Sequence, residues 1–326
     1  MTLVRDVGEQ GVLQKLKAFC PSDVIGDDGA ILALKSSESL VVTTDVLVEN
    51  IHFSDRTTAP EDIGWRAVAA NLSDLAAMGA TPVGLTVGLS LHGEVSLDWL
   101  DRLYQGLTAC TSTYQTAIVG GDVCRSPVVS LAITAFGQVA PQRAIRRHTA
   151  SPGNAIVVTG DHGSARAGLE LLLQDEIPQD LTPEQRQTLI DAHQRPRPRL
   201  DVLAPLYALL GQQGCAGMDS SDGLADAVIQ VCRESNVGAS LKAEAIPIAP
   251  ELRSWVGVER ALDWALYGGE DFELLLCLPP DMAAELVQQI GGNAAIVGTI
   301  AGDRAVQLQT GDDWQTLSQQ SGFQHF

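Results

Sequence analysis

Apolar and polar positions along the chain follow two alternating patterns. Short apolar runs, typical of strands buried in a sheet, occur at residues 30–34, 40–44, 83–91, 117–119, 128–137, 155–159, 272–278 and 294–300, and the first two predict a strand pair. Elsewhere apolar residues recur at three- and four-residue spacing, as in amphipathic helices, at residues 60–79, 97–114, 164–173, 183–195 and 222–234. Strands that alternate with helices in both halves predict an α/β (α+β) fold.

Capping residues indicate where two of these helices begin. Thr58 and Glu61 have the spacing of a capping box, and Thr182 and Gln185 repeat it, each time with a proline at the first helical position. Gly79 lies where the first of these helices should end. We therefore expect both helices to form with well-defined ends.

The length of the chain favours two domains. It has 326 residues and 45% apolar content, enough for two separate cores. Residues 141–153 contain two prolines and a group of basic side chains in an acidic protein, namely Arg143, Arg146, Arg147 and His148. We place the boundary there and expect an N-terminal domain at 1–142 and a C-terminal domain at 143–326.

Composition excludes several classes of partner. With 21 basic and 40 acidic side chains the net charge is −19, so we expect no nucleic-acid partner. The six cysteines are scattered without a Cys-x-x-Cys spacing, which fits reduced thiols and a cytoplasmic location. Residues 1–17 lack the apolar core of a signal peptide, and no stretch approaches the length of a membrane span, so we expect a soluble protein without a membrane partner.

Five acidic clusters indicate a metal site. They lie at the ends of apolar runs or beside glycines, at residues 26–28, 43–45, 120–122, 219–223 and 268–271. Two carboxylates in contact repel each other by about 4 kcal/mol at an effective dielectric constant of 20, so acids that converge need a cation. Hard oxygen ligands suit Mg²⁺, which usually accompanies a phosphate-bearing substrate.

Each cluster on its own also has a plainer explanation. Asp27, Asp28 and Asp45 are of a type that is common in ordinary turns. Against this, Asp45 and two threonines follow the apolar residues 40–42, and α/β folds bind ligands at strand ends. Asp74 could be a solvent-facing helical acid, but its Leu and Ala neighbours favour a partly buried ligand.

The glycine-flanked clusters also leave alternatives open. Gly120 and Gly121 can mark a hairpin, a bulge or a place where backbone approaches phosphate. Residues 219–223 open a predicted helix, so Ser221 or Asp222 could simply be its N-cap. Alternatively, Asp219 and Asp222 face one ion while the helix N-terminus attracts phosphate, and residues 160–163 form a similar glycine-rich turn.

Other candidates have structural explanations that sequence logic alone does not exclude. His52 is typical of a structural histidine, Arg146 and Arg147 of solvated surface charges, and Phe323 of a terminal aromatic residue. The chain has no phosphate-binding loop with its lysine. If a nucleotide binds, the acids and their Mg²⁺ ions must do the work of that lysine.

Taken in order, the motifs resemble those of the thiamine-monophosphate kinases, a family of the aminoimidazole ribonucleotide synthetase-like (PurM-like) superfamily. The resemblance spans nearly the whole chain and rests on residues 25–30, 43–45, 71–79, 120–122, 219–223 and 268–272, with 52–53 and the aromatic tail favouring this family. It implies an N-terminal ATP- and Mg-binding domain that pairs with its copy in a homodimer, and a C-terminal α/β domain that completes the active site.

The resemblance also implies roles for individual residues in the transfer of the γ-phosphoryl group of ATP to thiamine monophosphate. The Mg²⁺ ligands would be Asp28, Thr44, Asp45, Asp74, Asp122, Asp219 and Asp222, among which Asp45, Asp122 and Asp219 would be catalytic. The nucleotide or its metal shell would contact Thr43, Tyr104, Gly121, Asp122, Arg147 and Ser221. The thiamine part would contact His52, Glu270 and Phe323.

The chemistry needs no covalent nucleophile, because the acceptor phosphate is already anionic at neutral pH, and we expect direct in-line transfer with several Mg²⁺ ions. One alternative is another ATP-dependent synthetase of the superfamily, of the selenophosphate or purine-pathway type. The selenophosphate enzymes carry a reactive Cys or selenocysteine near the N-terminus, whereas the only cysteine in that part of this chain is Cys20. A second alternative, from a different class, is a non-catalytic acidic metal buffer or scaffold.

Overall fold

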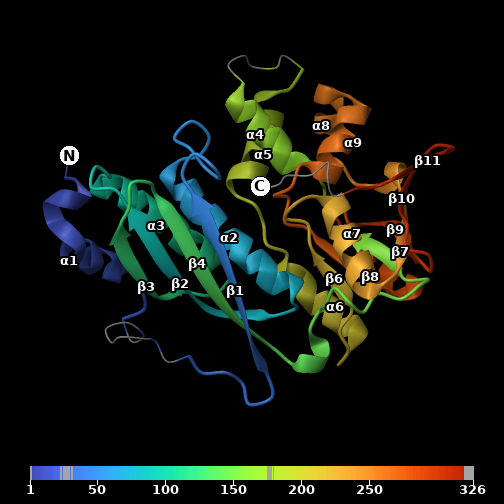
Figure 1. The fold of residues 1–326 in the computed structure, drawn as a ribbon, viewed down its shortest axis with the longest axis horizontal. Helices are drawn as coiled ribbons and strands as arrows, with labels where there is room; N and C mark the ends of the chain where they lie inside the picture. Colours follow the sequence, from blue (N-terminus) through green and yellow to red (C-terminus); the bar gives the residue numbers. More distant parts are fainter. Residues whose placement is uncertain are drawn as a thin grey trace. The chain divides into compact units, whose positions relative to one another are not determined.

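The computed structural model describes residues 2–22, 24, 30, 32–174, 178 and 180–318. Contacts between Cα atoms divide the chain into two compact units. Unit 1 comprises residues 1–75 and 80–140, and unit 2 comprises residues 76–79 and 141–326. Each unit has its own sheet (Figure 1).

Unit 1 is built on a four-stranded sheet with the strand order β1-β4-β2-β3. The strands are β1 (Ser39–Val48), β2 (Thr81–Leu91), β3 (Ile118–Arg125) and β4 (Ser130–Val139). Its helices are α1 (Val4–Leu16), the 3-10 turn η1 (Lys17–Phe19), α2 (Pro60–Ala77, whose last turn is assigned to unit 2) and α3 (Leu97–Thr113). β2 and β3 run parallel, and the other neighbouring strands run antiparallel.

One face of this sheet is covered and the other is open. Along β4, buried and partly exposed residues alternate strictly, as expected for a strand with one covered face. Leu75 of α2 packs at Gly137 of β4, and the backbone of Gly64 in α2 lies against that of Leu103 in α3. Helices α2 and α3 thus pack together, and α2 covers the sheet. The opposite, open face carries the exposed apolar residues Leu40, Val42 and Val46 of β1.

The prediction of a strand pair at residues 30–34 and 40–44 is wrong. Among the described residues of the first run, Ala30 and Leu32–Leu34 have no regular structure, and β1 pairs with β4 instead. Apolar composition alone does not supply a neighbour for hydrogen bonding, and β4 offers ten matched positions from Ser39↔Val139 to Val48↔Ser130. The predicted helices at 60–79 and 97–114 are confirmed by α2 and α3.

Unit 2 contains a seven-stranded sheet in the order β11-β10-β7-β9-β5-β8-β6. The strands are β5 (Ala155–Val158), β6 (Ala216–Asp219), β7 (Gly238–Lys242), β8 (Leu274–Leu278), β9 (Ala295–Ala301), β10 (Val306–Thr310) and β11 (Asp313–Thr316). The helices are α4 (Ser164–Leu173), α5 (Pro183–Gln194), α6 (Leu203–Leu210), α7 (Leu224–Ser235), α8 (Pro250–Val256), α9 (Val258–Tyr267) and α10 (Pro280–Ile290). Short 3-10 turns lie at η2 (Pro141–Arg143), η3 (Leu200–Val202) and η4 (Ala243–Ala245).

The sheet of unit 2 has a hydrophobic core on each face. Every residue of β5 and β8 is buried, which explains why their sequences are continuous apolar runs without alternation. Ile156 and Leu275 belong to a core that includes α7 and α9, whereas Val157 and Leu276 belong to a second core that includes α6 and α10. The mixed α/β class predicted from the sequence is confirmed in both units.

Two further observations bear on the composition. Among the residues that the structure describes, no helix is long and apolar enough to cross a membrane. All six cysteines lie in the described part and are free thiols, and only Cys124 on β3 is classed as exposed. This agrees with the expectation of reduced thiols.

Candidate active site

In unit 1, β1 and α2 bring three of the predicted site residues to the covered face of the sheet. The hydroxyl of Thr43 donates a hydrogen bond to a carboxylate oxygen of Asp74. Asp45 lies two residues further along β1, so its side chain points to the same face as that of Thr43. Asp74 is partly buried, as its neighbours in the sequence indicated. Two carboxylates and a hydroxyl therefore share this face.

Thr44 lies on the opposite, open face. It is paired with Thr134 of β4, and the two hydroxyl oxygens are 2.8 Å apart. The structure does not bring the Thr44 hydroxyl together with Asp45 or Asp74, because neighbouring residues of a strand point to opposite faces. A metal role for Thr44 beside those acids would have to use its main-chain carbonyl oxygen.

Asp122 also belongs to the open face. It is paired with Gly88, which is paired with Ala132, which in turn lies opposite Val46 of β1. Residues directly opposite each other in a sheet share a face, so Asp122 and Asp45 lie on different faces of the same sheet. Within unit 1 the structure therefore divides the predicted metal ligands into two groups.

The expectation that the acids occupy strand ends is wrong for two of them. Asp45 is inside β1 and Asp122 is inside β3, whereas Asp219 ends β6. Gly121 has a structural reason to be glycine, because a Cβ atom there would come within 2.3 Å of the Val87 carbonyl oxygen. At Gly120 the nearest atom to such a Cβ is a side-chain carbon of Thr86, at 3.5 Å.

A cavity of about 600 Å³ lies in unit 1 beside β3. Its wall is mainly apolar and includes α1, η1 and the predicted nucleotide contacts Tyr104, Gly121 and Asp122. The Tyr104 ring packs on Phe19 with their centroids 5.4 Å apart, and burial raises the pKa of the Tyr104 hydroxyl well above its ordinary value. The structure thus brings Tyr104 of α3 and the adjacent Gly121 and Asp122 of β3 to one apolar cavity.

His52 is partly buried in the turn that follows β1. Its Nδ1 accepts a hydrogen bond from the Val48 amide at 3.0 Å, so the proton of the neutral ring lies on Nε2. The guanidinium of Arg66 donates to the His52 carbonyl oxygen at 3.0 Å. These contacts fix the ring, and they are compatible with both the structural and the substrate-binding interpretations.

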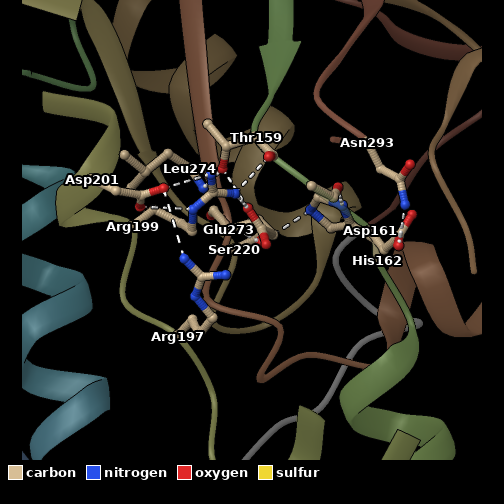
Figure 2. Close-up of polar contacts among 11 residues, drawn as sticks. Thr159, Asp161, His162, Arg197, Arg199, Asp201, Ser220, Glu273, Leu274 and Asn293 are labelled. Carbon is tan, nitrogen blue, oxygen red and sulfur yellow. Dashed lines mark hydrogen bonds and ion pairs between the residues drawn. The ribbon is translucent and has the colours of Figure 1, made fainter. Parts of the chain in front are cut away.

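In unit 2, three loops converge around Ser220. Its amide and its hydroxyl both donate to the Glu273 carbonyl oxygen, at 2.9 and 3.1 Å. Nε2 of His162, a wholly buried residue, lies 3.1 Å from the Ser220 hydroxyl (Figure 2). The Glu270 amide donates to the Ser221 carbonyl oxygen at 2.7 Å. The loop at 219–223 is therefore held to those at 159–163 and 268–273.

A largely buried ion pair, between Arg199 and Glu273, supports this arrangement (Figure 2). The Arg199 guanidinium donates to Glu273 at 2.5 Å and to Asp201 at 3.0 Å. The Thr159 hydroxyl also donates to Glu273, and Leu274 donates its amide to the Thr159 hydroxyl. Burial raises the pKa of Glu273, and the Arg199 charge opposes that shift. A buried carboxylate without a partner would be costly, and here Arg199 and Thr159 are the partners of Glu273. Their contacts hold the loop at 159–163 to the loop at 268–273.

Asp219, Ser221 and Asp222 lie before the helix rather than at its cap. Helix α7 begins at Leu224 with Gly223 as its N-cap, so neither Ser221 nor Asp222 occupies the N-cap position and that plainer explanation is wrong. Gly223 takes φ 99°, a conformation that residues with a side chain rarely adopt. Asp219 is only 3% exposed, whereas Asp222 is exposed.

The glycine-rich turn at 160–163 is not open to an anion. It leads into α4 as predicted, but the carboxylate of Asp271 accepts hydrogen bonds from the amides of Gly163 at 2.7 Å and Ala165 at 3.0 Å. Burial raises the pKa of Asp271 to about 7, and these two hydrogen bonds act in the opposite direction. The carboxylate thus satisfies the helix N-terminus from within the protein.

Arg147 is exposed and held by α7. Its guanidinium donates to the Gln230 amide oxygen at 2.8 Å, and the Gln230 amide nitrogen donates to Asp226 at 2.5 Å. Its carbonyl oxygen accepts from the Ser235 hydroxyl at 2.8 Å. The backbone of the neighbouring Arg146 forms an isolated parallel β-bridge with Ala216 of β6, so both arginines belong to an ordered segment.

Some predictions fall outside the described residues. These are Asp28, with its neighbour Asp27, and Phe323. Within the described ranges, no three side chains of His, Cys, Asp or Glu come together as metal ligands. On the covered face of unit 1, the Thr43 hydroxyl contacts the Asp74 carboxylate, and Asp45 lies on the same face.

Sequence reasoning missed the supporting residues of unit 2. The motifs do not single out Ser220, Asp271 or Glu273, although the structure gives each of them a hydrogen bond through its side chain. For His162, the available sequence signal is its position in the Gly-Asp-His-Gly turn that precedes α4. Nothing in the sequence pattern distinguishes Arg199 from the nearby Arg197.

Comparisons with known proteins agree with this architecture. Family models for the N-terminal and C-terminal domains of AIR synthase related protein match residues 26–139 and 151–311. The chain is 50% identical to thiamine-monophosphate kinase of Synechococcus elongatus over 325 residues, covering 98% of this chain and 97% of that relative.

Solved structures give the same result. The structure of thiamine-monophosphate kinase from Stenotrophomonas maltophilia K279a has a TM-score of 0.81 and 35% identity, covering 91% of this chain and 95% of that chain. The structure of AaThiL complexed with AMPPCP and TMP has a TM-score of 0.73 and 29% identity, covering 96% of this chain and 97% of that chain.

The two matched domains and the two sheets define a protein of the AIR synthase-related class, with a PurM-like fold. Within this class, the chain belongs to the thiamine-monophosphate kinase family. The resemblance stated from the motifs is thereby confirmed, and the chain is an enzyme of the kinase type. The comparisons therefore favour this family over the alternative of a selenophosphate or purine-pathway synthetase.

Proposed function

We propose that this protein transfers the γ-phosphoryl group of ATP to thiamine monophosphate, giving thiamine diphosphate and ADP. The observation that carries this proposal is the match to the thiamine-monophosphate kinases along nearly the whole chain. One of them is 50% identical to this chain. A relative with the same fold is AaThiL complexed with AMPPCP and TMP, which we take to be an ATP analogue and thiamine monophosphate. Those ligands correspond to the two proposed substrates.

Mg²⁺ is the cation that fits the donors present. Thr43, Asp45 and Asp74 offer only oxygen atoms on the covered face of unit 1, and hard oxygen donors suit Mg²⁺ rather than zinc. Bound Mg²⁺ supplies charge neutralisation at the phosphoryl oxygens. Asp122 lies on the other face of that sheet, and Asp219 and Asp222 lie in unit 2. Within unit 1, the division of Asp45 and Asp122 between the two faces supports more than one ion.

The cavity of unit 1 is the proposed site for the nucleoside part of ATP. It is large enough and mainly apolar, as pockets for flat aromatic ligands are. Tyr104 would contact the nucleoside, while Gly121 and Asp122 at the same wall would lie toward its phosphates or their metal ions. Arg147 and Ser221 of unit 2 would contact the phosphates. The hydrogen bond from the Arg147 guanidinium to Gln230 orients that side chain.

The transfer would proceed directly and in line. The acceptor phosphate is an anionic nucleophile at neutral pH, so the protein needs to align the reactants and neutralise charge. Asp45, Asp122 and Asp219 are the acids proposed for this role. His52, Glu270 and Phe323 remain the proposed contacts of the thiamine part. A covalent phosphoryl-enzyme formed during turnover would contradict direct transfer.

The open face of unit 1 supports a homodimer. Val42 and Val46 of β1, an edge strand, are 53% and 49% exposed on this face. Rows of exposed apolar side chains on a sheet mark association surfaces. A second copy of the chain is the proposed occupant, as the family resemblance implies.

A coupled assay tests the proposed function. Purified protein with ATP, Mg²⁺ and thiamine monophosphate should release ADP and thiamine diphosphate in equal amounts, and thiamine or aminoimidazole-pathway substrates should give no turnover. ATP binding without turnover of thiamine monophosphate would reject this substrate. Calorimetry with nucleotide, with and without Mg²⁺, would separate an enzyme from a metal buffer, because a buffer binds Mg²⁺ independently of ATP.

A further inference from the structure

The turn between α9 and β8 has a strained backbone at a residue with a proposed function. Glu270 takes φ 62° and Phe272 takes φ 52°, and Gly269 between α9 and Glu270 takes φ 68°. Glycine adopts such values freely, but glutamate and phenylalanine do so only at a cost. Strain of this kind persists where surrounding contacts impose it, and it concentrates at functional sites.

Asp271 supplies two of these contacts. Its carboxylate binds two amides at the start of α4, those of Gly163 and Ala165. Since both bonds join side-chain oxygen to fixed backbone, they determine the position of Asp271 and the direction of the chain on either side of it. The side chain of Glu270, its neighbour, is 37% exposed.

A further contact comes from α5. His193 is 2% exposed, and its Nδ1 lies 3.6 Å from a carboxylate oxygen of Glu270. Gly168 brings the two helices together, because a Cβ atom there would come within 2.1 Å of the Leu189 carbonyl oxygen of α5 and 2.9 Å of the His193 Cβ. Helices α4 and α5 also lie side by side in Figure 1. The α4–α5 pair therefore contacts both acids of the turn.

We propose that Asp271 and His193 are positioning residues for substrate specificity, which hold the Glu270 carboxylate in the orientation that receives the thiamine part of the substrate. This inference rests on the proposed function. Asp271 fixes the backbone of the turn through α4, and His193 lies beside the carboxylate itself. Neither residue touches the substrate.

The identity of residue 270 supports this assignment over simple loop geometry. The chain places glycine at 268 and 269 but glutamate at the next left-handed position. Glycine at 270 would relax the backbone. A turn built only for shape gains nothing from a carboxylate there, whereas a turn that must present a carboxylate does.

Three variants test the proposal. Asp271→Asn keeps the shape of the side chain but removes its charge and one of its acceptor oxygens, and His193→Gln removes the imidazole. Glu270→Gly removes both the strain and the carboxylate. Asp161→Asn is the matched control, because Asp161 belongs to the same glycine-rich turn but its carboxylate accepts from Asn293 at 2.6 Å. For each protein, KM for thiamine monophosphate, KM for ATP, kcat and melting temperature are measured.

We expect Asp271→Asn to raise KM for thiamine monophosphate by about tenfold, since small misplacements of binding groups are costly. His193→Gln should raise it less, and both should leave KM for ATP unchanged. Glu270→Gly should raise the melting temperature while weakening use of thiamine monophosphate. Asp161→Asn should behave as the parent protein.

Three outcomes would contradict the proposed role of Asp271 and His193. Equal increases in both KM values, or a lower melting temperature with unchanged KM values, would make Asp271 and His193 merely structural and overturn the proposal. A Glu270→Gly variant that melts lower than the parent would also overturn it, and this variant does not depend on the other two folding. Failure of the parent protein to use thiamine monophosphate would instead reject the proposed function.

Discussion

Thr43 of β1 and Asp74 of α2 are joined by a hydrogen bond from hydroxyl to carboxylate across the covered face of unit 1. The two residues are far apart in the sequence. Through this contact, Thr43, a proposed nucleotide contact, orients the carboxylate of Asp74, a proposed metal ligand. This gives Thr43 a defined structural role that can be tested by itself.

The first prediction concerns this contact. Thr43→Val keeps the shape of the side chain but removes the donor, and we expect kcat/KM to fall by about 10- to 100-fold, as when outer partners of metal ligands are lost. Thr43→Ser keeps the hydroxyl and should retain most activity. Equal losses in the two variants would show that packing matters and the hydrogen bond does not.

The second prediction concerns the acids themselves. Asp45→Asn and Asp219→Asn should each lower kcat by about 100-fold or more, because a neutral amide cannot stabilise the cations that neutralise the phosphoryl group. Steady-state kinetics across a range of Mg²⁺ concentrations is the measurement. Asp312→Asn, at an exposed position before β11, is the control. Near-normal kinetics of either variant at low Mg²⁺ would remove that acid from the proposed site.

The third prediction follows from the buried His162. Burial lowers the pKa of His162 to about 4 from its ordinary value of 6.5. Its contribution to stability is therefore fully present above pH 6.5 and is lost as the pH falls toward 4, by about 2 kcal/mol at pH 5. Urea unfolding of the parent protein and of His162→Gln at pH 7.5 and pH 5 measures this.

The parent protein should lose more stability than His162→Gln between these two pH values. A glutamine does not titrate, so the difference isolates the histidine. If both proteins lose the same amount, the acid sensitivity arises from other groups and the buried imidazole does not contribute.

The fourth prediction uses neighbouring glycines. Gly121→Ala places a methyl group 2.3 Å from the Val87 carbonyl oxygen, so we expect a loss of about 1–3 kcal/mol in stability. Gly120→Ala meets only a side-chain carbon of Thr86 at 3.5 Å and should be tolerated. Thermal melting of the two variants compares them directly. Equal melting temperatures would mean that β2 and β3 can separate enough to accept the methyl group.

The fifth prediction concerns association. Val42→Lys with Val46→Lys places two charges among the exposed apolar side chains of β1. If this face binds a second copy, the double variant should elute as a monomer where the parent protein elutes as a dimer. Light scattering coupled to gel filtration gives the mass. Val128→Lys, an exposed apolar position outside the strands, is the control.

The start of a helix was easier to predict than the pairing of a strand, and local chemistry explains why. Helix α5 begins at Pro183 because Thr182 and Gln185 form a capping box within four residues. A strand depends on a neighbour from elsewhere, which residues 32–34 lack. Helix α7 begins two residues later than expected because Gly223 takes a left-handed φ, which the pattern of apolar residues does not reveal.

The candidate site was predictable as a set of acids but not as an arrangement. Whether Asp45 and Asp122 share a face depends on the register of four strands, which no motif encodes. The residues that hold the loops of unit 2, such as Ser220 and Asp271, act through buried hydrogen bonds to backbone. Such bonds leave no periodic signal in the sequence.

The last turn of α2 has a consequence for dissecting the chain. Residues 76–79 belong to unit 2, where Ala76 and Ala77 lie in the core with Leu206. The Tyr207 hydroxyl donates to the Gly79 carbonyl oxygen at 3.1 Å, and the Ile145 amide donates to that of Met78 at 3.3 Å. A fragment of residues 141–326 would lack this turn and expose the apolar surface that it covers. The second half of the sequence is therefore not a complete folding unit.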